Sequence, residues 1–99
     1  MYSASEFDKG KELAKSGRYG EAIKFFDRAI AEKPDYKEAH NEKGKALVIL
    51  SRPKEAIKHF ILATMVDPDY IEAWTNMEGA HLMEGKYDLA IRCVDQILT

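Results

Sequence analysis

The chain has 99 residues, of which 45% are hydrophobic and 32% charged, and its formal net charge at pH 7 is −2. This balance fits a single domain, and basic residues matched by interleaved acidic ones argue against a nucleic-acid partner, which needs a basic face toward the phosphates. No stretch approaches the roughly 18 apolar residues of a membrane-spanning helix, and the first five residues lack the pattern of an export sequence, so we expect no membrane partner and a cytoplasmic protein.

Residues recur along the chain with a period of 34. The recurring sets are Ala22, Ala56 and Ala90, then Ile23, Ile57 and Ile91, then Phe26, Phe60 and Val94, and finally Pro34 and Pro68. In each of the first two copies an alanine, a phenylalanine and a second alanine stand at i, i+4 and i+7, on one face of a helix. A period of this length predicts stacked helical units that bury their apolar faces against their neighbours.

The first copy predicts two helices joined by a tight turn. The first helix spans residues 5–16, with Ser5 as its capping residue and Gly17 as the left-handed residue that closes it. The second spans about residues 20–33 and turns Phe26 toward the first. Its opposite side is expected to face solvent, with ion pairs at three- and four-residue spacing. That side consists of Glu21, Lys24, Arg28 and Glu32.

The second and third copies follow the same plan with local changes. Pro53 replaces a glycine-containing turn and suits the first turn of the next helix, where its missing N–H costs little. The Pro-Asp-Tyr sequences at 34–36 and 68–70 predict a proline that ends one helix and an aspartate that caps the next. The third copy has helices at about 71–84 and from about 88 onward, and it reaches Thr99 without a following proline. We therefore expect an array without its usual closing helix.

These residues resemble the tetratricopeptide repeat family, whose units of 34 residues each form a helix-turn-helix. The resemblance is carried by Gly10 and Gly44, Leu13 and Leu47, Gly17 and Gly85, Tyr19 and Tyr87, Trp74 and the two recurring prolines. Glu6 and His40 depart from the pattern, because they stand where the family's leading aromatic belongs. The resemblance implies an all-α, right-handed solenoid of antiparallel helix pairs, about six helices in one domain, residues 1–99. Its repeats would be 3–36, 37–70 and a shortened 71–99.

The residue types that carry catalysis or bind metals are few and scattered. His40, His59 and His81 fall at three different positions of the repeat, and none pairs with another histidine at i, i+4. We expect His59 to face solvent, His81 to occupy a buried position and His40 to replace the missing aromatic. Cys93 is expected to be a small buried residue, and the chain has no phosphate loop or nucleophile motif. The sequence therefore predicts a non-enzyme with no catalytic residue, cofactor or metal site.

The resemblance also implies a binding surface on the concave face, which the first helix of each pair lines in this family. Projected onto this chain, the peptide-binding groove consists of Phe7, Lys11, Lys15, Asn41, Lys45, Ile49, Thr75, Asn76 and Met83. Lys11 and Lys45 favour a partner with an acidic group beside apolar anchors. Val48 and Leu82 fit either this groove or the packing between neighbouring first helices. We therefore predict an adaptor or scaffold that binds a peptide or protein segment.

One subclass of the family grips the acidic C-terminus of chaperones through lysine, asparagine and arginine at five positions. Those positions hold Phe7, Lys11, Glu42, Glu72 and Asn76 here, and none matches. Two of the five are acidic, so Coulomb repulsion argues against a ligand rich in carboxylates at this place. We do not predict chaperone-tail binding.

The apolar side chains of the last predicted helix suggest a second possible function, because no further helix in the sequence packs against them. Ile91, Val94 and Leu98 can leave an apolar face at the end of the stack. Such a face favours a structural module that forms an end-to-end homodimer. It equally fits a fragment of a longer array, in which a further helix covers the same side chains.

Overall fold

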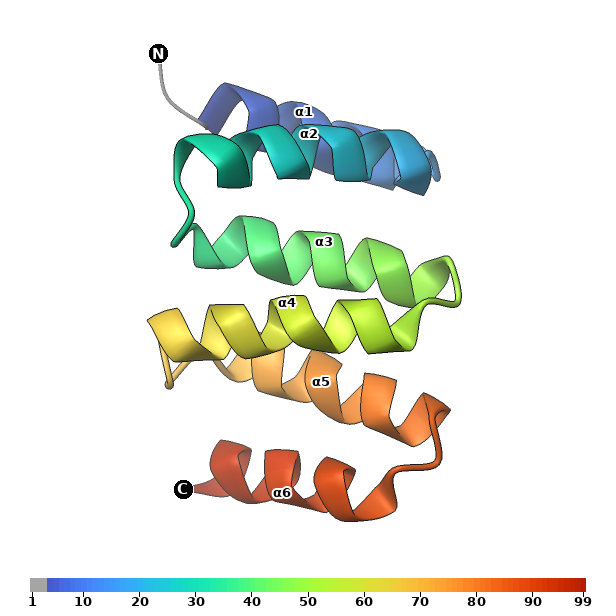
Figure 1. Cartoon of the computed structure of the whole chain (residues 1–99), viewed down its shortest axis with the longest axis vertical. Helices are drawn as coiled ribbons and strands as arrows, with labels where there is room; N and C mark the ends of the chain where they lie inside the picture. The colour runs from blue at the N-terminus through green and yellow to red at the C-terminus, as the bar shows by residue number, and fades with distance from the viewer. Residues whose placement is uncertain (1–3) are drawn as a thin grey trace.

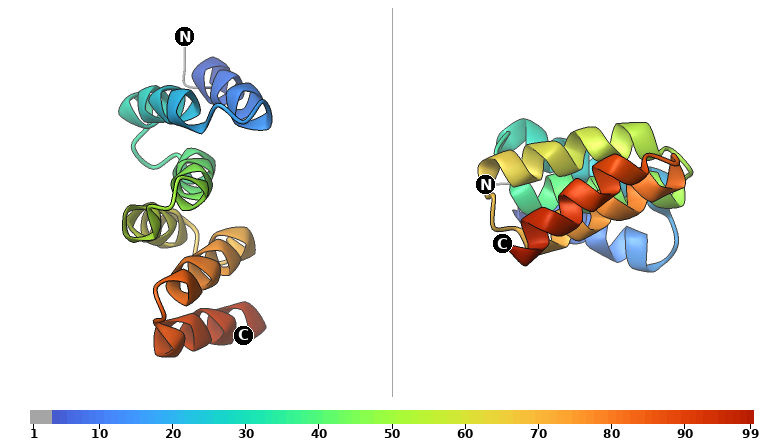
Figure 2. Two further views of the ribbon diagram at one scale, coloured as in Figure 1. Left: turned by 90° about the vertical axis from the view of Figure 1, so that its right-hand side faces the viewer. Right: turned by 90° about the horizontal axis from the view of Figure 1, so that it is seen from below.

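The structure is a computed structural model that describes residues 4–99, and over this range the chain forms six α-helices stacked in order along one axis (Figure 1). The helices are α1 (Ala4–Lys15), α2 (Tyr19–Glu32), α3 (Lys37–Ile49), α4 (Pro53–Val66), α5 (Ile71–Met83) and α6 (Tyr87–Leu98). Helices α1 and α2, α3 and α4, and α5 and α6 form the first, second and third helix pairs of a stack 40 Å long. Figure 2 shows α1, α3 and α5 along one side of it. The predicted all-α solenoid of antiparallel pairs is confirmed.

No helix within residues 4–99 is long and apolar enough to cross a membrane. Where the sequence predicted a boundary, for both ends of α1, α2 and α5 and for the start of α6, the structure agrees with it to within one residue. The agreement follows from the repeat itself, because glycine or proline ends almost every element.

Each helix pair closes through the same left-handed turn. Gly17 and Gly85 have φ angles of 79° and 70°, as expected, and Ser51 takes the equivalent place with a φ of 62°. The residue after each turn donates its N–H to a carbonyl five residues earlier, as in the 2.9 Å bond from Arg18 to Leu13. This closure satisfies the last carbonyl groups of the first helix. Ser51 was not foreseen, since a residue with a side chain rarely adopts positive φ.

The predicted helix caps are wrong. Ser5 lies inside α1 rather than before it, and the residue that precedes α1 falls outside the described range. Helices α3 and α5 begin after Tyr36 and Tyr70, and neither has a side-chain cap. The reason is that the Tyr36 N–H bonds to the Lys33 carbonyl at 3.0 Å, which places the Pro-Asp pair inside a turn instead of next to the helix.

The core of each of the first two pairs is a phenylalanine packed onto a glycine of the facing helix. Phe26 and Phe60 are fully buried, between alanines that are also buried. A Cβ on Gly10 would lie 2.6 Å from Phe26 Cε1, and a Cβ on Gly44 would overlap the Phe60 ring. The two helices therefore approach closely only because these positions lack a side chain. Here the sequence prediction of the helix faces is confirmed.

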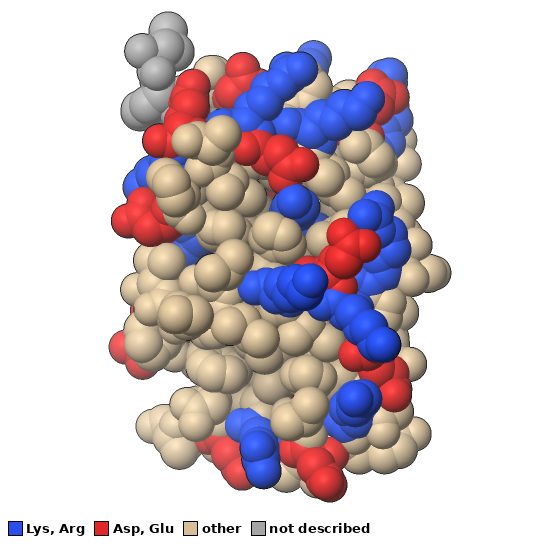
Figure 3. Space-filling model, in the orientation of Figure 1, with Lys and Arg blue, Asp and Glu red and all other residues tan. Residues whose placement is uncertain are grey.

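The outer face of the stack, formed by the exposed sides of α2 and α4, carries interleaved acidic and basic side chains (Figure 3). The exposed residues predicted on α2 are all exposed. Their ion pairs differ from the predicted ones: Glu21 pairs with Arg18 at 2.8 Å, and Arg28 approaches Glu6 at 3.8 Å. Helix α4 departs from α2 in its second half, where Ile61, Leu62, Met65 and Val66 are exposed.

Candidate functional site

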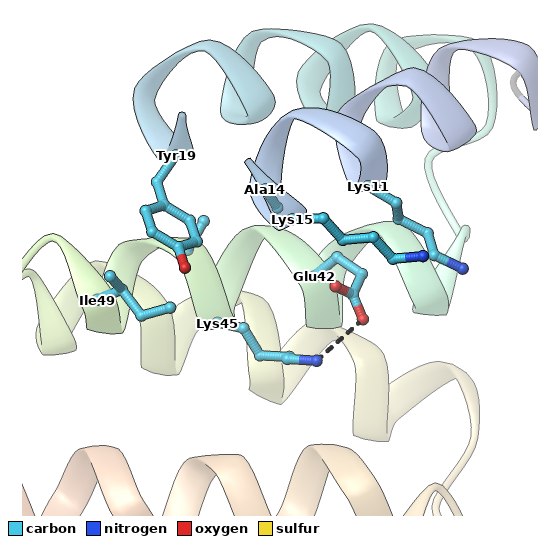
Figure 4. A pocket seen from close by; sticks show the side chains of 8 residues that line it. Lys11, Ala14, Lys15, Tyr19, Glu42, Lys45 and Ile49 are labelled. Carbon is cyan, nitrogen blue, oxygen red and sulfur yellow. Dashed lines mark hydrogen bonds and ion pairs between the residues drawn. The ribbon is translucent and has the colours of Figure 1, made fainter. Parts of the chain in front are cut away.

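Two adjoining hollows open on the side of the stack lined by α1, α3 and α5. The first, of about 320 Å³, is lined by Lys11, Ala14, Lys15, Tyr19, Glu42, Lys45, Ala46 and Ile49 (Figure 4). The second, of about 310 Å³, is lined by Lys45, Val48, Ile49, Phe60, Thr75, Asn76, Gly79, Ala80 and Met83. Because Lys45 and Ile49 belong to both, the hollows form one continuous surface, which we call the groove.

Most of the residues predicted for the binding surface line this groove. The residues are Lys11, Lys15, Lys45, Ile49, Thr75, Asn76 and Met83. They come together because equivalent positions of the 34-residue repeat face the same side in every pair. Val48, for which two interpretations were open, lies in the second hollow and also packs against the core.

Phe7 was predicted in the groove and instead belongs to the core. It is buried, with its ring centroid 5.9 Å from that of Phe26 and 5.0 Å from that of Tyr36. The Lys11 ammonium lies over the Phe7 ring, 5.1 Å from the centroid. Since Glu6 stands where an aromatic is expected, Phe7 is the ring that fills the start of the first pair.

Asn41 was also predicted in the groove and is fully buried between α3 and α5. Its amide donates to Glu72 Oε2 at 2.9 Å, and its carbonyl oxygen accepts from Asn76 Nδ2 at 3.0 Å. Asn41 thus joins the second pair to the third, and it fixes Glu72 beside Lys45, which the two hollows share. Sequence reasoning missed this role because Asn41 lies about one repeat before Glu72 and Asn76, and each of the three alone has the character of a surface residue.

The charges along the groove are unevenly compensated. The Lys45 ammonium lies 3.4 Å from a Glu42 oxygen and 3.6 Å from a Glu72 oxygen. Lys11 and Lys15 are exposed, and neither forms an ion pair with any carboxylate of residues 4–99. Figure 4 shows both side chains extending from α1 across α3. The free positive charge of the groove is therefore at its α1 end.

Carboxylates surround Tyr70 at the seam between the second and third pairs. Burial first, and then the charges of Glu72, Glu38 and Glu42, raises the pKa of Tyr70 to about 12. The hydroxyl therefore stays protonated at neutral pH.

The histidines form one contact that the sequence did not reveal. His40 Nε2 lies 2.8 Å from the Pro34 carbonyl, which can only accept, so Nε2 carries the proton. In the neutral form of His40, Nδ1 is then an acceptor, and His59 Nδ1, 3.1 Å away, is placed to donate to it. Trp74 Nε1 donates to the Pro68 carbonyl at 2.8 Å, one repeat later. His40 therefore replaces the missing aromatic, as predicted.

The prediction that His59 faces solvent is wrong. The residue is partly buried, and its ring stacks on His40 with centroids 5.4 Å apart. Burial first, and then the Lys43 ammonium, lowers the pKa of His59 to about 4. The available clue was position, because His59 stands one repeat after Phe25, a site for a packed ring.

His81 and Cys93 are buried, as predicted. Burial lowers the pKa of His81 and raises the pKa of the Cys93 thiol. The part of the chain that the structure describes contains no cluster of three or more side chains able to hold a metal ion.

The end of the stack exposes apolar side chains of α6. Ile91 is 60% exposed and Leu98 78% exposed, whereas Val94 is partly buried. The equivalent Ile23 and Ile57 pack against a core cluster. The apolar face predicted at this end is thus present for Ile91 and Leu98.

Comparisons with known proteins agree with this architecture. The family model described as Tetratricopeptide repeat matches residues 7–64. A search of the curated proteins found no significant match.

Among solved structures, this chain is similar to the second tetratricopeptide repeat domain of Spaghetti (RPAP3) bound to the HSP90 peptide SRMEEVD. The two superpose with a TM-score of 0.95 and share 26% sequence identity, and the match covers 99% of this chain and 91% of that one. The second domain of human RPAP3, in complex with the HSP70 peptide SGPTIEEVD, has a TM-score of 0.93 and 26% identity, covering 97% and 80%. MamA, at 21% identity and a TM-score of 0.95 over 98% of this chain and 57% of that one, shows the fold alone. With the family model matching more than half of its length, this chain belongs to the tetratricopeptide repeat family.

Proposed function

We propose that the protein is an interaction module that holds a peptide or protein segment in the groove along α1, α3 and α5. The observation that carries the proposal is the pair of adjoining hollows, which share Lys45 and Ile49 and combine exposed lysines with exposed apolar side chains. Two similar domains hold peptides, which supports the same role for this chain. The proposed module is not an enzyme, and we propose a cytoplasmic location for it.

The peptides bound by those domains are not carried over to this chain. Of the five positions compared with the chaperone-tail subclass, Phe7 is buried, and Glu72 and Asn76 are hydrogen-bonded to Asn41. Glu42 and Glu72 also place negative charge at the centre of the groove. A peptide with several adjacent carboxylates would be repelled there. We therefore propose a segment of different sequence.

A short segment in an open groove is expected to bind with micromolar affinity, about −8 kcal/mol. The test is an affinity pull-down from cell extract with the wild type and two matched double variants. Lys45→Glu with Ile49→Asp changes the groove. Lys58→Glu with Ile61→Asp makes the same substitutions on the outer face of α4, where both residues are exposed.

We expect the groove variant to lose the specific partners and the outer-face variant to keep them. Partners that survive the groove substitutions and are lost with the outer-face ones would place the contact on α4 and overturn the proposal. Thermal melts of all three proteins show whether any loss comes from unfolding.

A second candidate function is self-association through α6, favoured by the exposure of Ile91 and Leu98. Covering an exposed apolar side chain gains roughly 1.5 to 3 kcal/mol, so two or three from each copy can offset the several kcal/mol that association costs. A two-fold dimer is the commonest symmetric arrangement. Sedimentation velocity between about 10 and 100 μM should then show association that Val94→Lys with Leu98→Lys removes. A monomer over this range would reject the dimer.

A further inference from the structure

We propose that the groove takes its ligand in one orientation, with an acidic side chain on Lys11 and Lys15 of α1 and an apolar side chain in the second hollow beside Met83 of α5. The inference rests on the proposed function and adds the chemistry and the direction of the ligand.

The basic end is defined by two lysines one helical turn apart. Their spacing of four residues places both on one face of α1, where like charges repel. Figure 4 shows both side chains over the first hollow, with the charged ends on the same side of Glu42. An anionic group beside the two ammonium groups relieves their repulsion and forms charge-assisted hydrogen bonds. The contact with the Phe7 ring holds Lys11 in place without neutralising it.

The centre of the groove is closed to an acidic group. Lys45 already has Glu42 and Glu72 as partners, and Asn41 holds Glu72 from behind. An acidic ligand group here would compete with two fixed carboxylates for one ammonium. The sequence predicts that Lys11 and Lys45 attract the acidic group of the partner. Because Lys45 already has two carboxylate partners, we assign that role to Lys11 and Lys15 instead.

The other end of the groove is apolar. Ile49 is 54% exposed and Met83 52% exposed, and both line the second hollow together with Val48 and Ala80. Its lining contains one charged residue, Lys45, which is already paired. A leucine, isoleucine, methionine or phenylalanine side chain of the ligand fits this environment.

The separation of the two ends sets the spacing in the ligand. Neighbouring packed helices lie roughly 10 Å apart, and an extended chain rises about 3.3 Å per residue. A segment that runs from α1 to the hollow between α3 and α5 thus places its acidic and apolar residues about four to six positions apart.

The experiment is a selection from a phage library of random dodecapeptides, run in parallel on three proteins. These are the wild type, a charge-reversed groove variant with Lys11→Glu and Lys15→Glu, and an outer-face control with Lys24→Glu and Lys58→Glu. We expect the wild type and the control to enrich peptides with aspartate or glutamate at that spacing from an apolar residue. The groove variant should instead enrich lysine or arginine and keep the apolar residue. Circular dichroism melts confirm that all three fold.

The outcomes separate this inference from the proposed function. Peptides enriched on the wild type without an acidic residue, or an acidic preference that survives reversal of both lysines, overturn the inference and leave groove binding intact. Failure to enrich any peptide sequence sinks both. For a selected peptide, fluorescence anisotropy should show about tenfold weaker binding to Lys15→Ala, with the difference shrinking in high salt.

Discussion

The third helix pair differs from the first two at the contact that holds each pair together. In the first two, Phe26 and Phe60 pack against Gly10 and Gly44. Val94 stands at the phenylalanine position of the third pair and is partly buried. Glu78 stands at the position of Gly10 and Gly44, while Gly79 is one residue out of register and lines the second hollow, where a Cβ would meet nothing within 4 Å. The same backbone plan thus persists without the contact of an aromatic ring on a glycine.

The two ends of the groove therefore stand on helix pairs that are packed differently. Its basic end stands on α1, which packs through Gly10 on Phe26, while its apolar end depends on Met83 of the third pair. The third pair is joined to the second by the Asn41 hydrogen bonds and by the core cluster that includes Leu47 and Met77. We infer that α6 is the least stabilised helix, since its other side is exposed.

The largest effect is expected from removing the ring of the second pair. Phe60→Ala should cost about 3 to 5 kcal/mol, because it empties the space between α3 and α4. Val94→Ala should cost only about 1 kcal/mol, since its side chain is smaller and partly exposed. Lys58→Ala, on the outer face, is the control and should stay within about 0.5 kcal/mol. Urea denaturation measures all three, and equal losses would contradict the assignment of helix faces.

Alanine substitution of two glycines should change stability in opposite directions. Gly44→Ala forces a methyl group into the Phe60 ring and should destabilise by about 1 to 3 kcal/mol. Gly79→Ala meets nothing and should stabilise by up to about 1 kcal/mol through better helix propensity. Thermal melts compare the stabilities of the two variants with that of the wild type. A loss of stability in Gly79→Ala as large as that in Gly44→Ala would contradict the open surroundings of Gly79 in the second hollow.

The second pair should also lose stability in mild acid, through His59. Its folded pKa of about 4 lies below the ordinary 6.5, so between these values the unfolded chain binds a proton that the folded chain excludes. The contribution is complete above pH 6.5 and is lost as the pH falls toward 4. Because the ring is partly exposed, we expect about 1 to 2 kcal/mol.

The matched variant is His59→Phe, which copies Phe25 of the first pair. It should flatten most of the pH dependence of urea midpoints between pH 4.5 and 7, leaving a smaller part from His81, whose pKa is also lowered. An unchanged slope in this variant would rule out His59 as the source.

The repeat made much of this molecule predictable from sequence. The period placed Phe26 and Phe60 in the core, and the family resemblance placed Lys11, Ile49 and Met83 on the concave face. Local errors arose where contacts between different helices, or a turn hydrogen bond, decide the outcome. Asn41 depends on residues about one repeat away, and the burial of His59 depends on His40 of a different helix. Asp35 was wrongly predicted to cap α3, because the turn hydrogen bond between Tyr36 and Lys33 decides where the helix begins.

Amide hydrogen exchange with and without a peptide selected on the wild type tests the central claim most directly. In the free protein, α6 should exchange faster than α4. The peptide should slow exchange in α1, α3 and α5, which line the groove, with the second-helix amides of the first two pairs nearly unchanged. Protection confined to α2, α4 or α6, with α1, α3 and α5 unaffected, would contradict the groove as the binding surface.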